Sequence, residues 1–70
     1  MPANEGPWFI ELTDSENEPT LINLSQITNI VAHIGGGSCV VFHNRDAIIV
    51  TETVAEITQR ILSVVRNTDL

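Results

Sequence analysis

The chain has 70 residues, of which nine are acidic and only three basic, and a formal net charge of −6 at pH 7. Nucleic-acid binders draw much of their affinity from cationic contacts to phosphate, so this balance argues against DNA or RNA as a partner. A chain this short buries only about 60% of its unfolded surface, and it usually needs a disulfide, a metal or a second subunit for stability.

The single cysteine cannot close an internal disulfide, which favours a reducing compartment. The first residues contain no basic region and no long apolar run, so we expect neither a signal peptide nor insertion into a membrane. We therefore expect a cytoplasmic protein. Residues 1–7 lack any periodicity and are expected to form a flexible N-terminal tail.

The first structured segments are predicted to form a hairpin. Residues 8–13 alternate along the chain, with Ile10 and Leu12 on one face, as in a β-strand. Residues 14–19 read as a polar turn, and residues 20–24 as a second short strand.

The central segments are predicted to form three more strands. Residues 25–34 begin either with a short turn or with one turn of 3₁₀ helix, and their β-branched content predicts a strand from Thr28 onward. Residues 38–43 and 47–50 are apolar runs of strand length, joined by a turn in which Asn44 suits a positive φ.

The last element is predicted to be an amphipathic helix that ends near Asn67. Thr53, followed three residues later by Glu56, fits a capping box at the start of this helix. We therefore predict an α+β fold with one domain over residues 8–66, in which a small antiparallel meander of about five strands precedes the helix, and a C-terminal tail over residues 67–70. The apolar helix face is expected to contain Val54, Ile57, Ile61, Val64 and Val65.

Three consecutive glycines, Gly35, Gly36 and Gly37, raise the question of a phosphate-binding loop. Such a loop runs from a strand into a helix N-terminus and carries a lysine. This chain has no lysine, and the glycines lead into apolar residues typical of a strand. We therefore predict that the glycines form the three-residue loop of a β-hairpin.

The predicted pairing places apolar residues on both faces of the central sheet. This pairing sets Ile34 opposite Ser38 and His43 opposite Asp46. The chain has one predicted helix, and one helix can cover only one face of the sheet. Exposed apolar patches usually mark interfaces, so we predict a homo-oligomer, with a dimer as the commonest symmetric form. The predicted interface residues are Val31, His33, Cys39, Val41, His43, Ile48 and Val50.

No arrangement in this register indicates chemistry. Cys39 and His43 stand four residues apart on one strand, roughly 13 Å, which is too far for both to bind one metal ion. His33 is expected opposite Cys39, but a Cys–His nucleophile needs an orienting third group and an oxyanion site, which the sequence does not show. We expect no enzyme activity, no cofactor and no metal site; a metal shared across an oligomer axis, and a Cys39-dependent enzyme or redox sensor, stay open as alternatives.

A spaced pattern of apolar, turn and cap residues runs through most of the chain. It reads I-x-L-T at residues 10–13, V-x-F-x-N at residues 40–44 and I-x-V-x-E-T-V-x-E-I at residues 48–57. This pattern resembles the small flagellar and swarming-motility proteins called FlbD or SwrD. The resemblance implies a cytoplasmic, non-enzymatic accessory protein that acts by contact, and it carries over no catalytic residue.

The function that we predict is a non-catalytic interaction or regulatory module that acts as a homo-oligomer and contacts an unidentified protein partner. The alternative is an acidic inhibitor, of phage type or mimicking nucleic acid, that occupies a basic groove on its target. The secondary candidates for partner binding are Asp14, Glu16 and Glu18 in the polar turn, and Gly35, Gly36 and Gly37 in the glycine loop.

Overall fold

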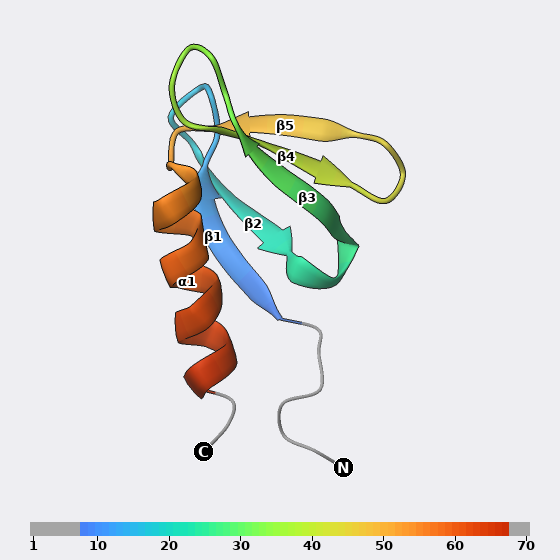
Figure 1. The fold of residues 1–70 in the computed structure, drawn as a ribbon, viewed down its shortest axis with the longest axis vertical. Coiled ribbons are helices and arrows are strands. Elements are labelled where there is room, and N and C mark those ends of the chain that lie inside the picture. The colour runs from blue at the N-terminus through green and yellow to red at the C-terminus, as the bar shows by residue number, and fades with distance from the viewer. Residues whose placement is uncertain (1–7, 68–70) are drawn as a thin grey trace.

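The computed structural model describes residues 8–67 and confirms an α+β fold with five antiparallel strands and one C-terminal helix (Figure 1). The expected tails lie outside the described residues, except that Asn67 is the last residue of the helix. In chain order the elements are β1 (Phe9–Thr13), β2 (Pro19–Asn23), the 3₁₀ turn η1 (Leu24–Gln26), β3 (Ile27–Ala32), β4 (Ser38–Phe42), β5 (Ala47–Val50) and α1 (Val54–Asn67).

The strands form two sheets, so the single meander that we expected is wrong. β1 pairs with β2, and β3, β4 and β5 form a separate three-stranded sheet in that order. The break lies at η1, where the Asn23 side chain accepts the backbone N–H of Ser25 at 3.0 Å and holds the chain in a turn. Because this turn redirects the backbone, β3 begins a new sheet.

The two sheets meet at one corner. Asp14 forms a bridge with Val50, and the N–H of Thr51 donates to the carbonyl of Thr13 at 2.8 Å. The α1 helix lies along β1 and also contacts β3, so it covers the space between the sheets (Figure 1). Among the described residues, the buried apolar side chains that fill this space are Ile10, Leu12, Ile22, Val40, Val50 and Ile57.

The predicted capping box at the start of α1 is confirmed. The Thr53 N–H donates to Oε1 of Glu56 at 2.8 Å, and the Glu56 N–H donates to Oγ1 of Thr53 at 3.1 Å. Ile57 is buried one turn into the helix, whereas Val54 is 37% exposed and lies at the rim of the apolar face. Further along the same face, Ile61 and Val64 pack against the core.

All three hairpins close with the same backbone geometry. In the β1–β2 hairpin, Asp14 donates its N–H to the Glu18 carbonyl and accepts the N–H of Asn17, both at 2.9 Å. The other two hairpins repeat these two bonds, which define a three-residue loop made of a type I turn followed by a left-handed residue. The left-handed residues are Asn17 (φ 66°), Gly36 (φ 107°) and Arg45 (φ 74°).

The turn that we predicted between β4 and β5 is wrong. We expected a two-residue turn that pairs His43 with Asp46 and places Asn44 at positive φ. Instead the Phe42 N–H donates to the Asp46 carbonyl at 2.9 Å, and Arg45 takes the positive φ. The loop therefore contains residues 43–45, one residue more than expected.

One extra loop residue exchanges the two faces of β5. Cys39 lies opposite Ile49, and Val40 lies opposite Ile48. Ile48 and Val50, which we expected on the uncovered face, instead turn toward the core, where Val50 is only 1% exposed. Ile49 takes their place on the other face.

The pairing of β3 with β4 also differs from expectation, but by two residues. Ala32 rather than Ile34 pairs with Ser38, and Val31 rather than His33 lies opposite Cys39. Because side chains alternate with a period of two, this difference leaves residues 29–32 on the faces that we expected.

A bulge at Thr28 changes the pairing at the start of β3. Asn29 lies opposite Val41 rather than opposite His43. His43 lies in the loop beyond β4, where its N–H donates to the carbonyl of Gln26 at 2.9 Å. The bulge adds one residue to β3 without a partner on β4.

The glycine loop gives a test with an internal control. Gly37 has φ 74°, and a Cβ there would overlap the carbonyl oxygen of Val50, whereas a Cβ at Gly35 would meet only the His33 ring at an ordinary 3.5 Å. We expect Gly37→Ala to lower the free energy of unfolding by about 2 kcal/mol or more, from backbone strain and the clash. Gly35→Ala should be neutral within about 0.5 kcal/mol. Urea denaturation followed by circular dichroism measures both, and equal stabilities would contradict the described loop.

Candidate functional site

The outer face of the three-stranded sheet is the candidate interaction site. We define this outer face as the side of β3, β4 and β5 that points away from the core. Burial alternates along β4, where Ser38 and Val40 are buried and Cys39 and Val41 are only partly buried, as expected for a sheet with one face in the core. The register places six residues on the outer face, none of them charged: Asn29, Val31, Cys39, Val41, Ala47 and Ile49.

Three of the predicted interface residues lie together on the outer face. Val31, Cys39 and Val41 are neighbours there, and Val31 is 47% exposed. Ile49 completes the apolar patch, although the sequence pattern placed it on the other face. The sequence analysis placed Ile49 wrongly because it made the loop between β4 and β5 one residue too short. The last residue of this loop is Arg45, and arginine rarely adopts a positive φ, so nothing in the sequence indicates the longer loop.

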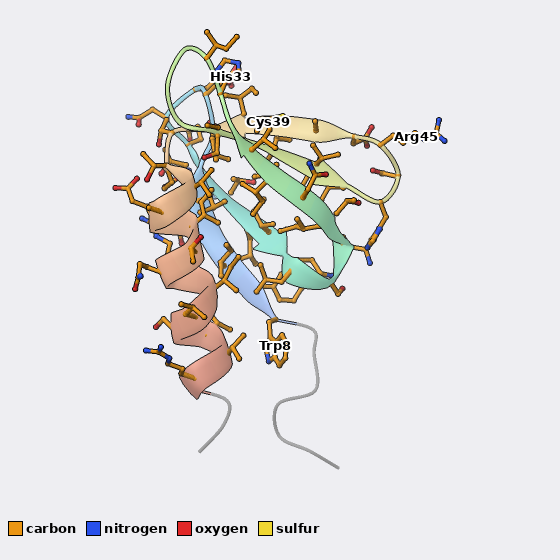
Figure 2. All side chains as sticks on the ribbon, in the orientation of Figure 1. Trp8, His33, Cys39 and Arg45 are labelled. Atoms are coloured by element: carbon orange, nitrogen blue, oxygen red, sulfur yellow. The ribbon has the colours of Figure 1, made fainter. Side chains whose placement is uncertain are left out.

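The two histidines lie outside the outer face, in the loops at the two ends of the sheet. His33 precedes the glycine loop, where its Nδ1 accepts the N–H of Gly35 at 3.2 Å (Figure 2). His43 lies in the loop at the other end of β4, with its Nδ1 3.3 Å from Oγ1 of Thr28. The structure therefore forms no His33–Cys39 pair across the strands, since Val31 occupies that position.

The glycine loop uses its own backbone donors. The Gly35 N–H is bonded to the His33 ring, and the Gly36 N–H donates to the His33 carbonyl at 3.0 Å. A phosphate cradle needs such N–H groups to point at the ligand. A hollow of about 420 Å³ lies beside the loop and is bordered by Ser15 and Ile49, but the N–H groups of Gly35 and Gly36 are engaged within the turn.

The acidic turn, residues 14–18, is held by one of its own carboxylates. Oδ1 of Asp14 accepts the N–H groups of Glu16 at 2.9 Å and of Glu18 at 3.0 Å. Asp14 therefore stabilises the turn, whereas Glu16 and Glu18 are exposed. The three acidic residues that we expected to act together thus have different roles.

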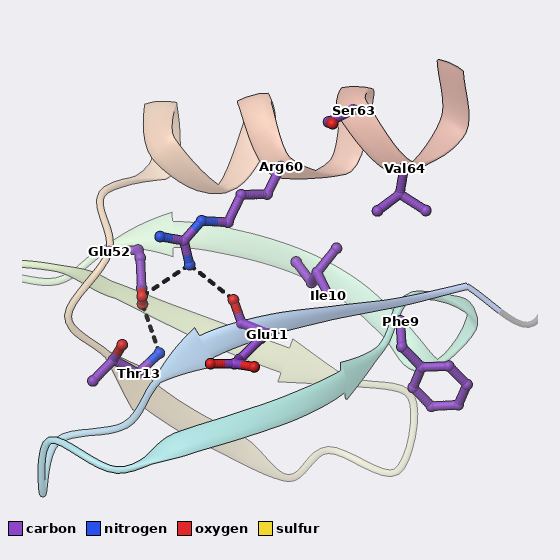
Figure 3. A pocket seen from close by; sticks show the side chains of 8 residues that line it. All are labelled: Phe9, Ile10, Glu11, Thr13, Glu52, Arg60, Ser63 and Val64. Atoms are coloured by element: carbon purple, nitrogen blue, oxygen red, sulfur yellow. Dashed lines mark hydrogen bonds and ion pairs between the residues drawn. The ribbon is translucent and has the colours of Figure 1, made fainter. Parts of the chain in front are cut away.

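A buried carboxylate that the sequence analysis missed lies between β1 and α1. Glu52 is 6% exposed, and its Oε1 accepts the N–H of Thr13 at 2.9 Å (Figure 3). Its Oε2 accepts a hydrogen bond from Nη1 of Arg60 at 3.0 Å. The backbone carbonyl of Glu52 accepts a hydrogen bond from the hydroxyl of Ser38 at 2.8 Å. No local pattern in the sequence indicates this carboxylate, because its partner Thr13 is 39 residues away along the chain.

The surroundings of Glu52 keep it ionised. Burial raises the pKa of Glu52, but hydrogen bonds from the backbone and side chain of Thr13, from its own backbone and from Arg60 together outweigh burial, so the pKa lies below the ordinary value of 4.5. A general acid or base at neutral pH needs a pKa near 7. The groove of about 470 Å³ that Glu52 and Arg60 border therefore holds a structural ion pair.

A smaller hollow lies where β1 begins. It measures about 300 Å³ and is lined by Trp8, Leu24, Ser25, Ile61 and Val65. The indole Nε1 of Trp8 is buried and has no hydrogen-bond partner among the described residues. This tryptophan lies far along β1 from the corner where the two sheets meet (Figure 2).

Two classes of site are absent from residues 8–67. No group of three or more His, Cys, Asp or Glu side chains in this range is placed to hold a metal ion. The helix in this range is too short and too polar to cross a bilayer.

No family model, curated protein or solved structure matches the chain.

The lowered pKa of Glu52 predicts a specific acid sensitivity. A carboxylate whose pKa is depressed by folding contributes stability above its unfolded pKa of about 4.5, and this contribution is lost as the pH falls through the folded pKa. Glu52→Gln should lower the free energy of unfolding at pH 7 by about 1–3 kcal/mol, because a neutral amide accepts these hydrogen bonds less strongly than a carboxylate does. It should also flatten the decline in stability below about pH 4.5.

Urea denaturation at several pH values between neutral and acid measures both effects. Glu18→Gln removes the same charge from an exposed position and is the matched control. A Glu52→Gln variant with the stability and acid profile of the native chain would show that the carboxylate does not hold the fold.

Proposed function

We propose that the chain is a non-catalytic, cytoplasmic interaction module that acts as a homodimer through the outer face of its three-stranded sheet. The observation that carries the proposal is the composition of that face, where Val31, Cys39, Val41 and Ile49 form an aliphatic patch without any charge. An antiparallel sheet with one face in water normally carries polar side chains on that face. A second subunit removes this apolar area from water.

Self-association fits this surface better than capture of an unrelated ligand. The α1 helix lies on the core side, so none of the described elements covers the outer face. A flat aliphatic patch is complementary to its own copy, and closed two-fold dimers are the commonest oligomers. Burial of further apolar area also supplies stability that a domain of this size lacks.

The proposal includes the contact-based accessory role that the resemblance to FlbD and SwrD implies. In this dimer the exposed side of α1 is available to a further protein partner. The acidic-inhibitor alternative has less support, because Asp14 is engaged in holding its own turn and only Glu16 and Glu18 remain exposed.

Charged substitutions on the outer face test the proposal. The native chain of 7.7 kDa should scatter light as a dimer at high concentration. Val41→Glu should give folded monomers, with the dissociation constant raised at least about tenfold, because an unpaired carboxylate is costly to bury in an apolar interface. Val31→Glu, at a more exposed position, should act in the same way and guards against a folding defect in the first variant.

Leu62→Glu is the matched control. Leu62 is 38% exposed on α1, and the substitution adds the same charge away from the outer face. It should leave the dimer mass unchanged. A native chain that stays monomeric at all concentrations, or an oligomer that survives both Val41→Glu and Val31→Glu, would overturn the proposal.

A further inference from the structure

Arg45, which Asp46 follows directly, and the acidic turn lie at the two ends of the outer face. Arg45 lies in the loop of residues 43–45 that joins β4 to β5, and Figure 2 shows its side chain directed away from the molecule. The acidic turn lies at the other end of β5, where Asp14 bridges Val50. Ser15 of this turn borders the same hollow as Ile49, so the acidic turn adjoins the outer face.

The two loops close on opposite sides of Val40, the middle residue of β4. Ser38 pairs with Val50, which bridges Asp14, so the acidic turn closes two residues before Val40. The loop that carries Arg45 closes at Phe42, two residues after Val40. Counted along β4, the closing residue of the Arg45 loop and the residue level with Asp14 therefore stand two residues from Val40 on opposite sides.

Arg45 occupies a backbone position that disfavours it. Its φ is 74°, a left-handed conformation that glycine or asparagine adopts at lower cost. Its guanidinium is exposed and has no hydrogen-bond or ion-pair partner among the described residues. Backbone strain without a local contact is a reason to look for a role of the side chain outside the folded chain.

A two-fold axis that runs parallel to two stacked outer faces has two limiting directions. If the axis is parallel to the strands, the same ends of the two sheets lie together, and the Arg45 loop of one copy lies over the Arg45 loop of the other. If the axis runs across the strands at Val40, the strands are antiparallel and each Arg45 loop lies over the acidic turn of the other copy. The attraction between Arg45 and the acidic turn favours the second arrangement, because it brings these opposite charges together.

We propose that the dimer has this antiparallel arrangement, with Arg45 of each copy paired with Glu16 of the other. The inference rests on the proposed function, since it assigns the geometry of the same interface. It explains why an arginine occupies a left-handed position, and why an acidic chain can associate through a face that is itself uncharged.

Charge reversal and mixing test the arrangement. In a homodimer of Arg45→Glu or of Glu16→Arg, both symmetric contacts become repulsive, so each variant alone should dimerise at least about tenfold more weakly than the native chain. In an equimolar mixture, the heterodimer contains one reversed pair and one native pair, both attractive. The mixture should therefore associate more tightly than either variant alone, as measured by sedimentation velocity at low salt.

Two further variants separate contact from folding. Arg45→Gly relaxes the backbone, so it should raise the free energy of unfolding while weakening the dimer. Arg66→Glu changes the net charge as much as Arg45→Glu at an exposed position on α1, and it should affect the dimer less.

The outcomes distinguish this inference from the proposed function. A native monomer would overturn both. A native dimer that Val41→Glu dissociates, but whose affinity Arg45→Glu and Glu16→Arg leave unchanged, would overturn only the antiparallel arrangement. A mixture no tighter than the single variants would also overturn it.

Discussion

The carboxylate of Glu52 is the contact that holds the layers of this small fold in place. The two sheets meet at the corner near Asp14 and Val50, and Glu52 follows that corner directly. It joins β1 through Thr13 and α1 through Arg60, with hydrogen-bond donors that offset the cost of burying its charge. Because these bonds keep α1 on the inner side, the opposite face of the three-stranded sheet stays open.

The strands and the helix could be predicted from local patterns, whereas the division of the strands into two sheets and the contacts between elements could not. Alternation, β-branched runs and the Thr53–Glu56 box depend on neighbouring residues, and they located all six regular elements. The division into two sheets depends on η1, whose single turn was visible only as one of two alternatives. The role of Glu52 depends on Thr13 and Ser38, which are distant in sequence, so no local pattern indicates it.

The candidate site shows how one turn decides a surface. Val31, Cys39 and Val41 were assigned correctly to one face, because the loop before β4 changed the pairing by an even number of residues. The loop after β4 changed it by one, which moved Val50 into the core and brought Ile49 out. A positive φ at Arg45 is the physical cause, and residue preferences alone favour Asn44 for that position.

The position of Trp8 makes the chain report on its own structure optically. It is the only tryptophan, and it lies beside η1 and the second half of α1, with its indole nitrogen buried. Indole emission therefore follows the docking of the helix end against the start of β1. The outer face is formed by other strands, so the proposed dimer would leave the surroundings of this chromophore unchanged, and its emission would follow unfolding and not dissociation.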